Sequence, residues 1–78
     1  MKYRFYLRIG TDTLEEAQGF LNRTAAIRAF RTTALQLLDF GQEIEASIHK
    51  AKDREHLDEY PDWVLSIGPR GGVVVDRA

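Results

Sequence analysis

Residues 3–9, Tyr-Arg-Phe-Tyr-Leu-Arg-Ile, alternate strictly and decide how the chain begins to fold. One side of an extended chain would carry the apolar set, namely Tyr3, Phe5, Leu7 and Ile9. The other side would carry Lys2, Arg4, Tyr6 and Arg8. Because strands have a period of two and favour aromatic residues, this pattern predicts a strand with one buried face, ended by Gly10.

Residues 25–40 show the clearest helical pattern of the chain. Five apolar residues fall within one stripe at a period of 3.6, namely Ile27, Phe30, Ala34, Leu37 and Leu38. No Gly or Pro interrupts this segment, and Gly41 follows it as a C-cap residue should. The stripe predicts a long helix that packs on a sheet.

A short helix is predicted over residues 14–21, ahead of the long one. Leu14, Ala17 and Leu21 have helical spacing, and Thr13 with Glu16 fits a capping box. Asn22 is then a C-cap and Thr24 a new N-cap. One kinked helix over residues 13–40 is the alternative interpretation.

Three further strands are expected in the second half of the chain. Residues 43–49 alternate again, with Ile44, Ala46 and Ile48 on one side. The polar residues 51–62 predict a loop with a helical turn near 53–59. Residues 63–67 and 73–75 are apolar, and the turn sequence Gly-Pro-Arg-Gly-Gly at 68–72 predicts an antiparallel hairpin.

These elements predict one α+β domain over residues 1–78. The expected architecture is a four-stranded, mainly antiparallel sheet with the helices packed on one face. The expected order is strand, long helix with the short helix before it, and then three strands. A chain of 78 residues has a thin core, so burial of further surface by self-association would stabilise it.

Charge and composition exclude several classes of protein. The chain is 44% hydrophobic and 29% charged, which is typical of a globular protein. Its net charge of -1 argues against nonspecific nucleic-acid binding, which needs a basic surface. No stretch approaches the roughly 20 apolar residues of a membrane span, and the N-terminus lacks the apolar run of a secretory signal. A cytoplasmic protein with no membrane partner is therefore expected.

Two basic surfaces are candidates for binding a partner. The first is the polar side of the first strand, with Arg4, Tyr6 and Arg8, where pairing with Glu43 and Glu45 of a neighbouring strand is the favoured alternative. The second is Arg28 with Arg31 on the long helix, which lack an acidic residue three or four positions away. Two such guanidinium groups can grip a carboxylate or phosphate, unless loop carboxylates from residues 53–62 neutralise them.

Two more residues complete the candidate contacts. Tyr60 is held extended by Pro61, and Arg70 lies in the predicted hairpin turn; Tyr and Arg often dominate the energetics of interfaces. Trp63 is more simply a half-buried core residue.

Catalytic chemistry is not indicated. The chain has no Cys, and both serines fall within predicted strands rather than at a sharp turn. His49, Asp53, Glu55 and His56 match the spacing of no metal site, and Gly71-Gly72 lacks the residues of a phosphate loop. A ligand pocket is hard to fit in so small a domain. We therefore expect no enzymatic activity, no metal and no cofactor.

The function predicted from these observations is binding of another protein as a small inhibitor or adaptor, or association with a second copy as a homodimer. In size and layout alone, the chain is similar to compact proteins of phages and mobile elements, including anti-CRISPR inhibitors. A phage or mobile-element origin and an anti-defence role are what that similarity implies. The alternative is a nucleic-acid-binding module that uses the basic sheet face or the helix arginines.

Overall fold

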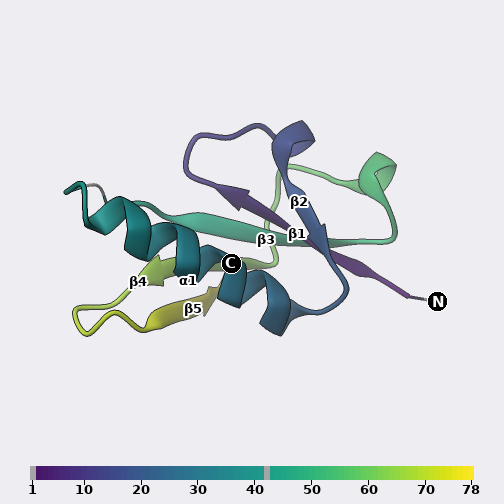
Figure 1. Cartoon of the computed structure of the whole chain (residues 1–78). Coiled ribbons are helices and arrows are strands. Elements are labelled where there is room, and N and C mark those ends of the chain that lie inside the picture. The colour runs from purple at the N-terminus through teal and green to yellow at the C-terminus, as the bar shows by residue number, and fades with distance from the viewer. Residues whose placement is uncertain (1, 42) are drawn as a thin grey trace.

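The computed structural model describes residues 2–41 and 43–78, and within them it contains one α-helix and five strands (Figure 1). The strands are β1 (Arg4–Ile9), β2 (Gln18–Phe20), β3 (Ala46–Ala51), β4 (Trp63–Ile67) and β5 (Val73–Arg77). The helix α1 spans Arg23–Leu38, and two single 3-10 turns, η1 and η2, span Leu14–Glu16 and Arg54–His56.

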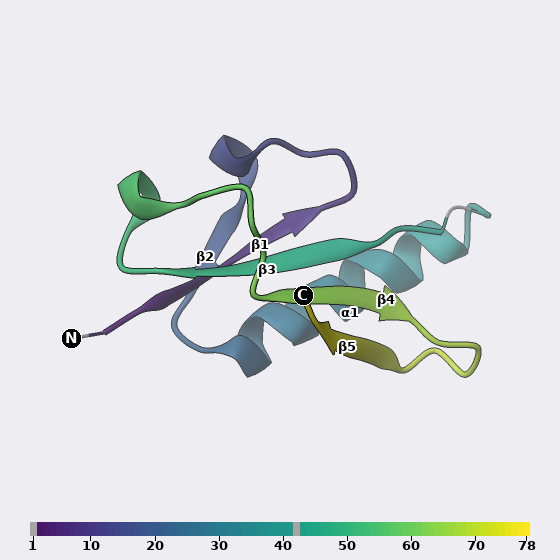
Figure 2. The same ribbon diagram turned by 180° about the vertical axis from the view of Figure 1, so that it is seen from behind.

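The strands form one sheet in the order β2-β1-β3-β4-β5, with every neighbouring pair antiparallel. Helix α1 lies across one face of this sheet, whereas η1 and η2 lie on the side away from it (Figures 1 and 2). The predicted α+β fold, with a helix packed on an antiparallel sheet, is confirmed. The predicted strand number is wrong, since the sheet has five described strands rather than four.

The extra strand replaces the short helix predicted over residues 14–21. Only Leu14–Glu16 turn, and residues 18–20 pair with β1, which brings Phe20 opposite Phe5. Gly19 explains why residues 18–20 form a strand instead of a helix. In this strand, a Cβ at position 19 would lie 3.0 Å from Cε1 of Tyr6. The sheet needs a residue without a side chain there, and Gly also disfavours a helix. The kinked helix over residues 13–40 is excluded for the same reason.

The caps around this segment differ from the prediction in part. Glu16 accepts hydrogen bonds from the Thr13 backbone N–H at 3.3 Å and from the Thr13 hydroxyl at 3.0 Å. The predicted contact between Thr13 and Glu16 therefore forms, but it begins a single 3-10 turn rather than a helix. Asn22 is the N-cap of α1 rather than a C-cap. Its Oδ1 accepts a 2.8 Å bond from the Ala25 N–H, and Thr24 lies inside the helix.

The main core lies between α1 and the sheet. Ala26, Phe30 and Ala34 of α1 are buried, as the helical stripe predicts. The sheet contributes Leu7, Ile48 and Leu65 to the same cluster. The small alanines on either side of Phe30 let the helix approach the sheet closely, so one large ring fills the centre of the core.

The other predicted strands form with shifted limits. Residues 63–67 form β4 as predicted, and β5 continues to Arg77. The strand expected over residues 43–49 begins at Ala46, because its pairing with β1 starts opposite Ile9 and ends opposite Arg4. The predicted hairpin turn closes with a 2.8 Å bond from the Gly68 N–H to the Gly72 carbonyl.

Candidate functional site

Five arginines lie on α1, in the turn before β5 and in β5 itself, and we call them the arginine row: Arg23, Arg28, Arg31, Arg70 and Arg77. All five are exposed. Sequence reasoning identified Arg28, Arg31 and Arg70 but missed the other two. Arg77 could have been found from the alternation of residues 73–77, which puts it on the same side as Val73 and Val75.

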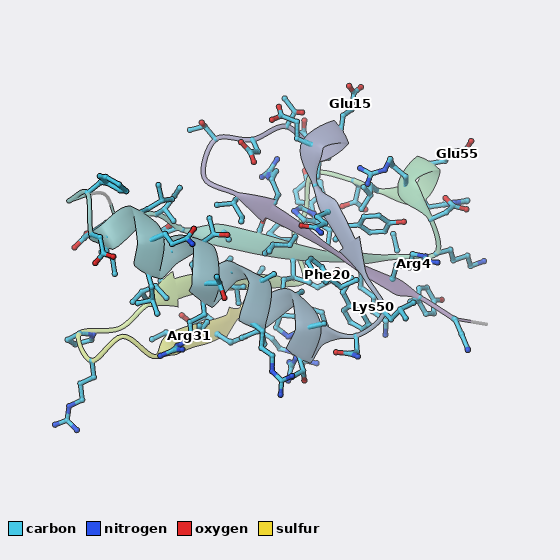
Figure 3. The ribbon with its side chains drawn as sticks, in the orientation of Figure 1. Arg4, Glu15, Phe20, Arg31, Lys50 and Glu55 are labelled. Atoms are coloured by element: carbon cyan, nitrogen blue, oxygen red, sulfur yellow. The ribbon has the colours of Figure 1, made fainter. Side chains whose placement is uncertain are left out.

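Two contacts fix the direction of α1 relative to β5. At one end, the Cζ atom of Arg23 lies 5.1 Å from the ring centroid of Trp63, and Trp63 is directly opposite Arg77 in the β4–β5 ladder. At the other end, Nε of Arg31 donates a 3.2 Å hydrogen bond to the Gly71 carbonyl (Figure 3). Helix and strand therefore run antiparallel along one side of the molecule.

The remaining members of the row follow from these anchors. Arg28 lies one helical turn before Arg31 and faces solvent on the outer side of α1, because a rotation of about 100° per residue places it nearly opposite the buried Phe30. Arg70 precedes Gly71, the residue that Arg31 contacts. From Arg23 to Arg31 the helix rises roughly 12 Å, at about 1.5 Å per residue. The cationic groups are thus spread along the β4–β5 hairpin, from the end that holds Trp63 to the turn at Gly71, instead of forming one point.

Among the residues that the structure describes, no acidic side chain forms an ion pair with the row. Across residues 2–41 and 43–78, the one ion pair within 4.0 Å joins His56 to Asp53. The carboxylates of the 53–62 loop, which the alternative interpretation assigned to Arg28 and Arg31, belong to a segment that packs on the opposite face of the sheet (Figure 2). Guanidinium groups without carboxylate neighbours attract anionic groups and bind carboxylates in a bidentate way.

The opposite face of the sheet does not form the open basic surface that was predicted. Tyr6 does point away from α1, but only 4% of it is exposed, because it packs with Ala17, Ala51 and Leu57 in a second small core. The predicted exposure of Tyr6 to a partner is therefore wrong. The prediction went wrong because the segments around η1 and η2 fold over this face, and no local pattern indicates that cover.

Arg4 and Arg8 also lack the predicted acidic partners. The register places Arg8 opposite Ser47 and Arg4 opposite Ala51, whereas Glu43 and Glu45 lie before β3 begins. Cross-strand Arg–Glu pairing is therefore wrong, and so is an open aromatic surface for stacking bases. Arg4 remains exposed, and the alternation of β1 puts it on the face of the sheet away from α1, because its neighbour Phe5 packs on the α1 side.

Arg54, which the sequence reasoning did not single out, holds the cover over Tyr6. Its guanidinium donates hydrogen bonds to the carbonyls of Glu15, at 3.0 Å, and Ala17, at 2.8 Å. It also lies 5.3 Å from the ring centroid of Tyr6. Arg54 belongs to the η2 turn and hydrogen-bonds to the η1 segment, so its side chain joins the two segments that cover this face of the sheet.

His49 is buried beside Tyr6 on this covered face. It is 2% exposed, and its Nε2 lies 2.8 Å from the Ser47 hydroxyl, whereas Nδ1 has no hydrogen-bond partner among the described residues. Burial lowers the pKa of His49, and the positive charge of Arg8 lowers it further. The backbone and carboxylate of Asp58 and the carboxylate of Asp62 act in the opposite direction on this pKa.

Tyr60 is 84% exposed, as predicted, and Trp63 is half-buried. Tyr60 lies in the loop between η2 and β4, so it does not belong to the arginine row. Trp63 packs on Phe5 with ring centroids 6.0 Å apart and supports Arg23 on its face. The structure thus brings together three of the seven predicted contact residues, Arg28, Arg31 and Arg70.

A groove of about 740 Å³ opens between the C-terminal end of α1 and the β4–β5 hairpin, although the sequence suggested that no pocket of this size would fit. Its walls include Leu38, Ile44 and Ile67, with Glu43 and Glu45 at its rim. Ser66 is the one hydroxyl among the described lining residues, and no histidine lies beside it. The geometry offers no activated nucleophile.

In the part of the chain that the structure describes, no three His, Asp or Glu side chains come together as metal ligands. Across the same residues, no helix has the length and apolar character to cross a membrane. Comparison with protein-family models, with curated proteins and with solved structures finds no match to this chain.

Proposed function

We propose that the chain is a small non-enzymatic binding protein that holds an acidic surface of another protein through the arginine row. The observation that carries the proposal is a set of five exposed arginines on α1 and the β4–β5 hairpin, with no carboxylate of the described residues within 4.0 Å. Cations left without carboxylate partners among the described residues retain their capacity to bind anionic groups. An inhibitor or adaptor of the kind that phages and mobile elements carry, acting in the cytoplasm, fits this size and surface.

Nucleic-acid binding is the second candidate, since phosphates also suit guanidinium groups. The net charge of -1 and the burial of Tyr6 both favour a protein partner instead. The acidic residues of the other surfaces would repel a long polyanion, whereas a protein places its carboxylates locally.

The test is capture from an extract of the source cells, with the full chain immobilised and the extract treated with nuclease. We expect a captured protein that the Arg28→Glu, Arg31→Glu variant loses. The matched control is Arg4→Glu, Lys52→Glu, which makes the same change in net charge at exposed positions away from the row. This control retains the partner.

Two results would contradict the proposal. Capture of the same proteins by both variants would show that the arginine row is not the contact. Capture that occurs only from extract without nuclease treatment, with binding that weakens steeply as salt rises, would favour the nucleic-acid alternative. Circular dichroism of both variants confirms that they fold, because surface substitutions of this kind change stability little.

A further inference from the structure

Strand β5 is an open edge of the sheet, and the hydrogen bonds at its two ends determine which of its backbone groups face β4 and which point outward. The Ala78 N–H donates to the Asp62 carbonyl at 3.2 Å, and the Gly68 N–H donates to the Gly72 carbonyl at 2.8 Å. In an antiparallel ladder, hydrogen-bonded pairs recur at every second residue. Val74 and Asp76 therefore face β4, and the backbone groups of Val73, Val75 and Arg77 point outward from the sheet.

These outward groups have no hydrogen-bond partner among the described residues. Residues 73–75 of this edge contain neither Pro nor a charged side chain, which are usual protections against pairing, and the charged Asp76 and Arg77 follow them at the end of the strand. The exposed Val74 (43%) lies on the face away from α1. The opposite edge differs, because β2 has only three residues. Strand β5 thus presents three free N–H and three free C=O groups in a row.

The arginine row lies beside this free edge and on one side of it. Val73 and Val75 pack against the core under α1, and Arg77 shares their side of the strand. The roughly 12 Å between Arg23 and Arg31 along the helix axis matches about four residues of extended chain. Alternate side chains of a strand recur about every 6.6 Å, so two or three carboxylates of one strand can face the row at once.

We propose that an extended acidic segment of a partner protein adds to β5 as a sixth strand and directs its carboxylates toward the arginine row. This inference rests on the proposed function of the row and names the form that the partner takes. Main-chain hydrogen bonds to Val73, Val75 and Arg77 hold the segment, and the arginines select acidic side chains on the side of α1.

Charge distinguishes this occupant from a second copy of the chain. If two β5 strands paired about a twofold axis through Val75, Val73 of each copy would face Arg77 of the other. Both arginine rows would then lie on the same side of the joined sheet. Like charges brought together in this way oppose the dimer, whereas an acidic strand neutralises the row.

The pairing also determines which residues of the segment hydrogen-bond to β5. Antiparallel pairing is the more stable arrangement, and each hydrogen-bonded pair then has both side chains on one face. The segment residues opposite Val73, Val75 and Arg77 point their side chains toward α1. The backbone N–H groups of the acidic residues therefore form hydrogen bonds with β5. The N–H groups of the intervening residues point away from β5.

The probe is the peptide acetyl-Val-Glu-Val-Glu-Val-Glu-Val-amide, added to the full chain labelled with ¹⁵N. Two matched derivatives carry three N-methyl groups each, either on the glutamates or on the valines that follow them. We expect the unmodified peptide to slow amide exchange of Val73, Val75 and Arg77 at least tenfold. The valine-methylated peptide retains binding, and the glutamate-methylated peptide binds at least about tenfold more weakly.

The results separate this proposal from the function of the arginine row. Absence of binding, or binding that leaves exchange of the three amides unchanged, overturns strand addition, as does equal binding by both methylated peptides. If the peptide binds without slowing exchange of the three amides, and the Arg28→Glu, Arg31→Glu variant no longer binds it, strand addition is wrong but the proposed function of the row stands. Slowed exchange that this variant preserves would instead show an edge that pairs without the arginines, and the acidic partner would be wrong.

Discussion

The guanidinium of Arg54 lies 5.3 Å from the ring centroid of Tyr6 and bonds three carbonyls of the η1 segment, those of Leu14, Glu15 and Ala17. Arg54 comes from η2, which follows β3, whereas Tyr6 lies in β1. One side chain thus joins segments about 40 residues apart and closes the second core over the sheet.

Replacing Arg54 by Ala is expected to destabilise the chain by about 1–2 kcal/mol, because carbonyls of the η1 segment lose their donor and Tyr6 loses its cover. Urea unfolding measures the change in the free energy of unfolding. Arg70→Ala is the control, since Arg70 lies in the exposed hairpin turn, and it should change stability by less than about 0.5 kcal/mol. Equal effects of the two substitutions would refute the locking role of Arg54.

A side chain at Gly19 is expected to disturb the packing of Tyr6. The Cβ of Gly19→Ala would lie 3.0 Å from Cε1 of Tyr6, so the ring or β2 must shift, at a cost of about 1–3 kcal/mol. Gly72→Ala is the matched control, because nothing lies within 4 Å of a Cβ there. Thermal unfolding of both variants tests the difference, and a Gly19→Ala variant as stable as Gly72→Ala would contradict it.

Phe30 is the largest side chain of the main core, and its ring is fully buried. Phe30→Ala should lower the free energy of unfolding by about 3–5 kcal/mol, through lost burial and the cavity that remains. Phe40→Ala removes the same ring from a position that is 82% exposed, and we expect a change within about 0.5 kcal/mol. Chemical denaturation compares the two, and a loss below about 1 kcal/mol at Phe30 would mean that the helix is turned differently.

Stability is expected to fall as the pH falls below about 6.5, because of His49. Burial lowers the pKa of His49 in the folded chain, so between that pKa and about 6.5 the unfolded chain binds a proton that the folded chain does not. The free energy of unfolding therefore decreases across this window, by at most about 1.4 kcal/mol per pH unit for one group, and levels off below it.

His49→Gln removes this titration and should flatten the pH profile of stability in the same window. Urea unfolding from pH 7.5 to 4.5 measures both chains. The titration of His49 itself, followed by NMR, should show a midpoint below that of a histidine in a short peptide. A profile for His49→Gln with the same slope as the parent chain would assign the pH dependence to other groups.

Much of the fold is encoded locally. The alternation of residues 3–9 and the apolar run of residues 63–67 correctly identified β1 and β4, and the apolar stripe of residues 25–40 correctly placed Phe30 and Ala34 against the sheet. These patterns are reliable because one face of each element is buried, and burial imposes the period of the element on its own sequence. The turn chemistry of residues 68–72 predicted the hairpin for the same local reason.

Long-range packing decided the rest. Residues 18–20 have a weak helical spacing of their own, and only pairing with β1 makes them a strand. The burial of Tyr6 depends on segments from two distant parts of the chain. The alternation of residues 3–9 could therefore indicate on which side of the strand Tyr6 lies, but not whether that side is exposed. The arginine row likewise arises where α1 meets the β4–β5 hairpin, because the approach of Arg31 to Gly71 and of Arg23 to Trp63 exists only once helix and hairpin have packed on one core.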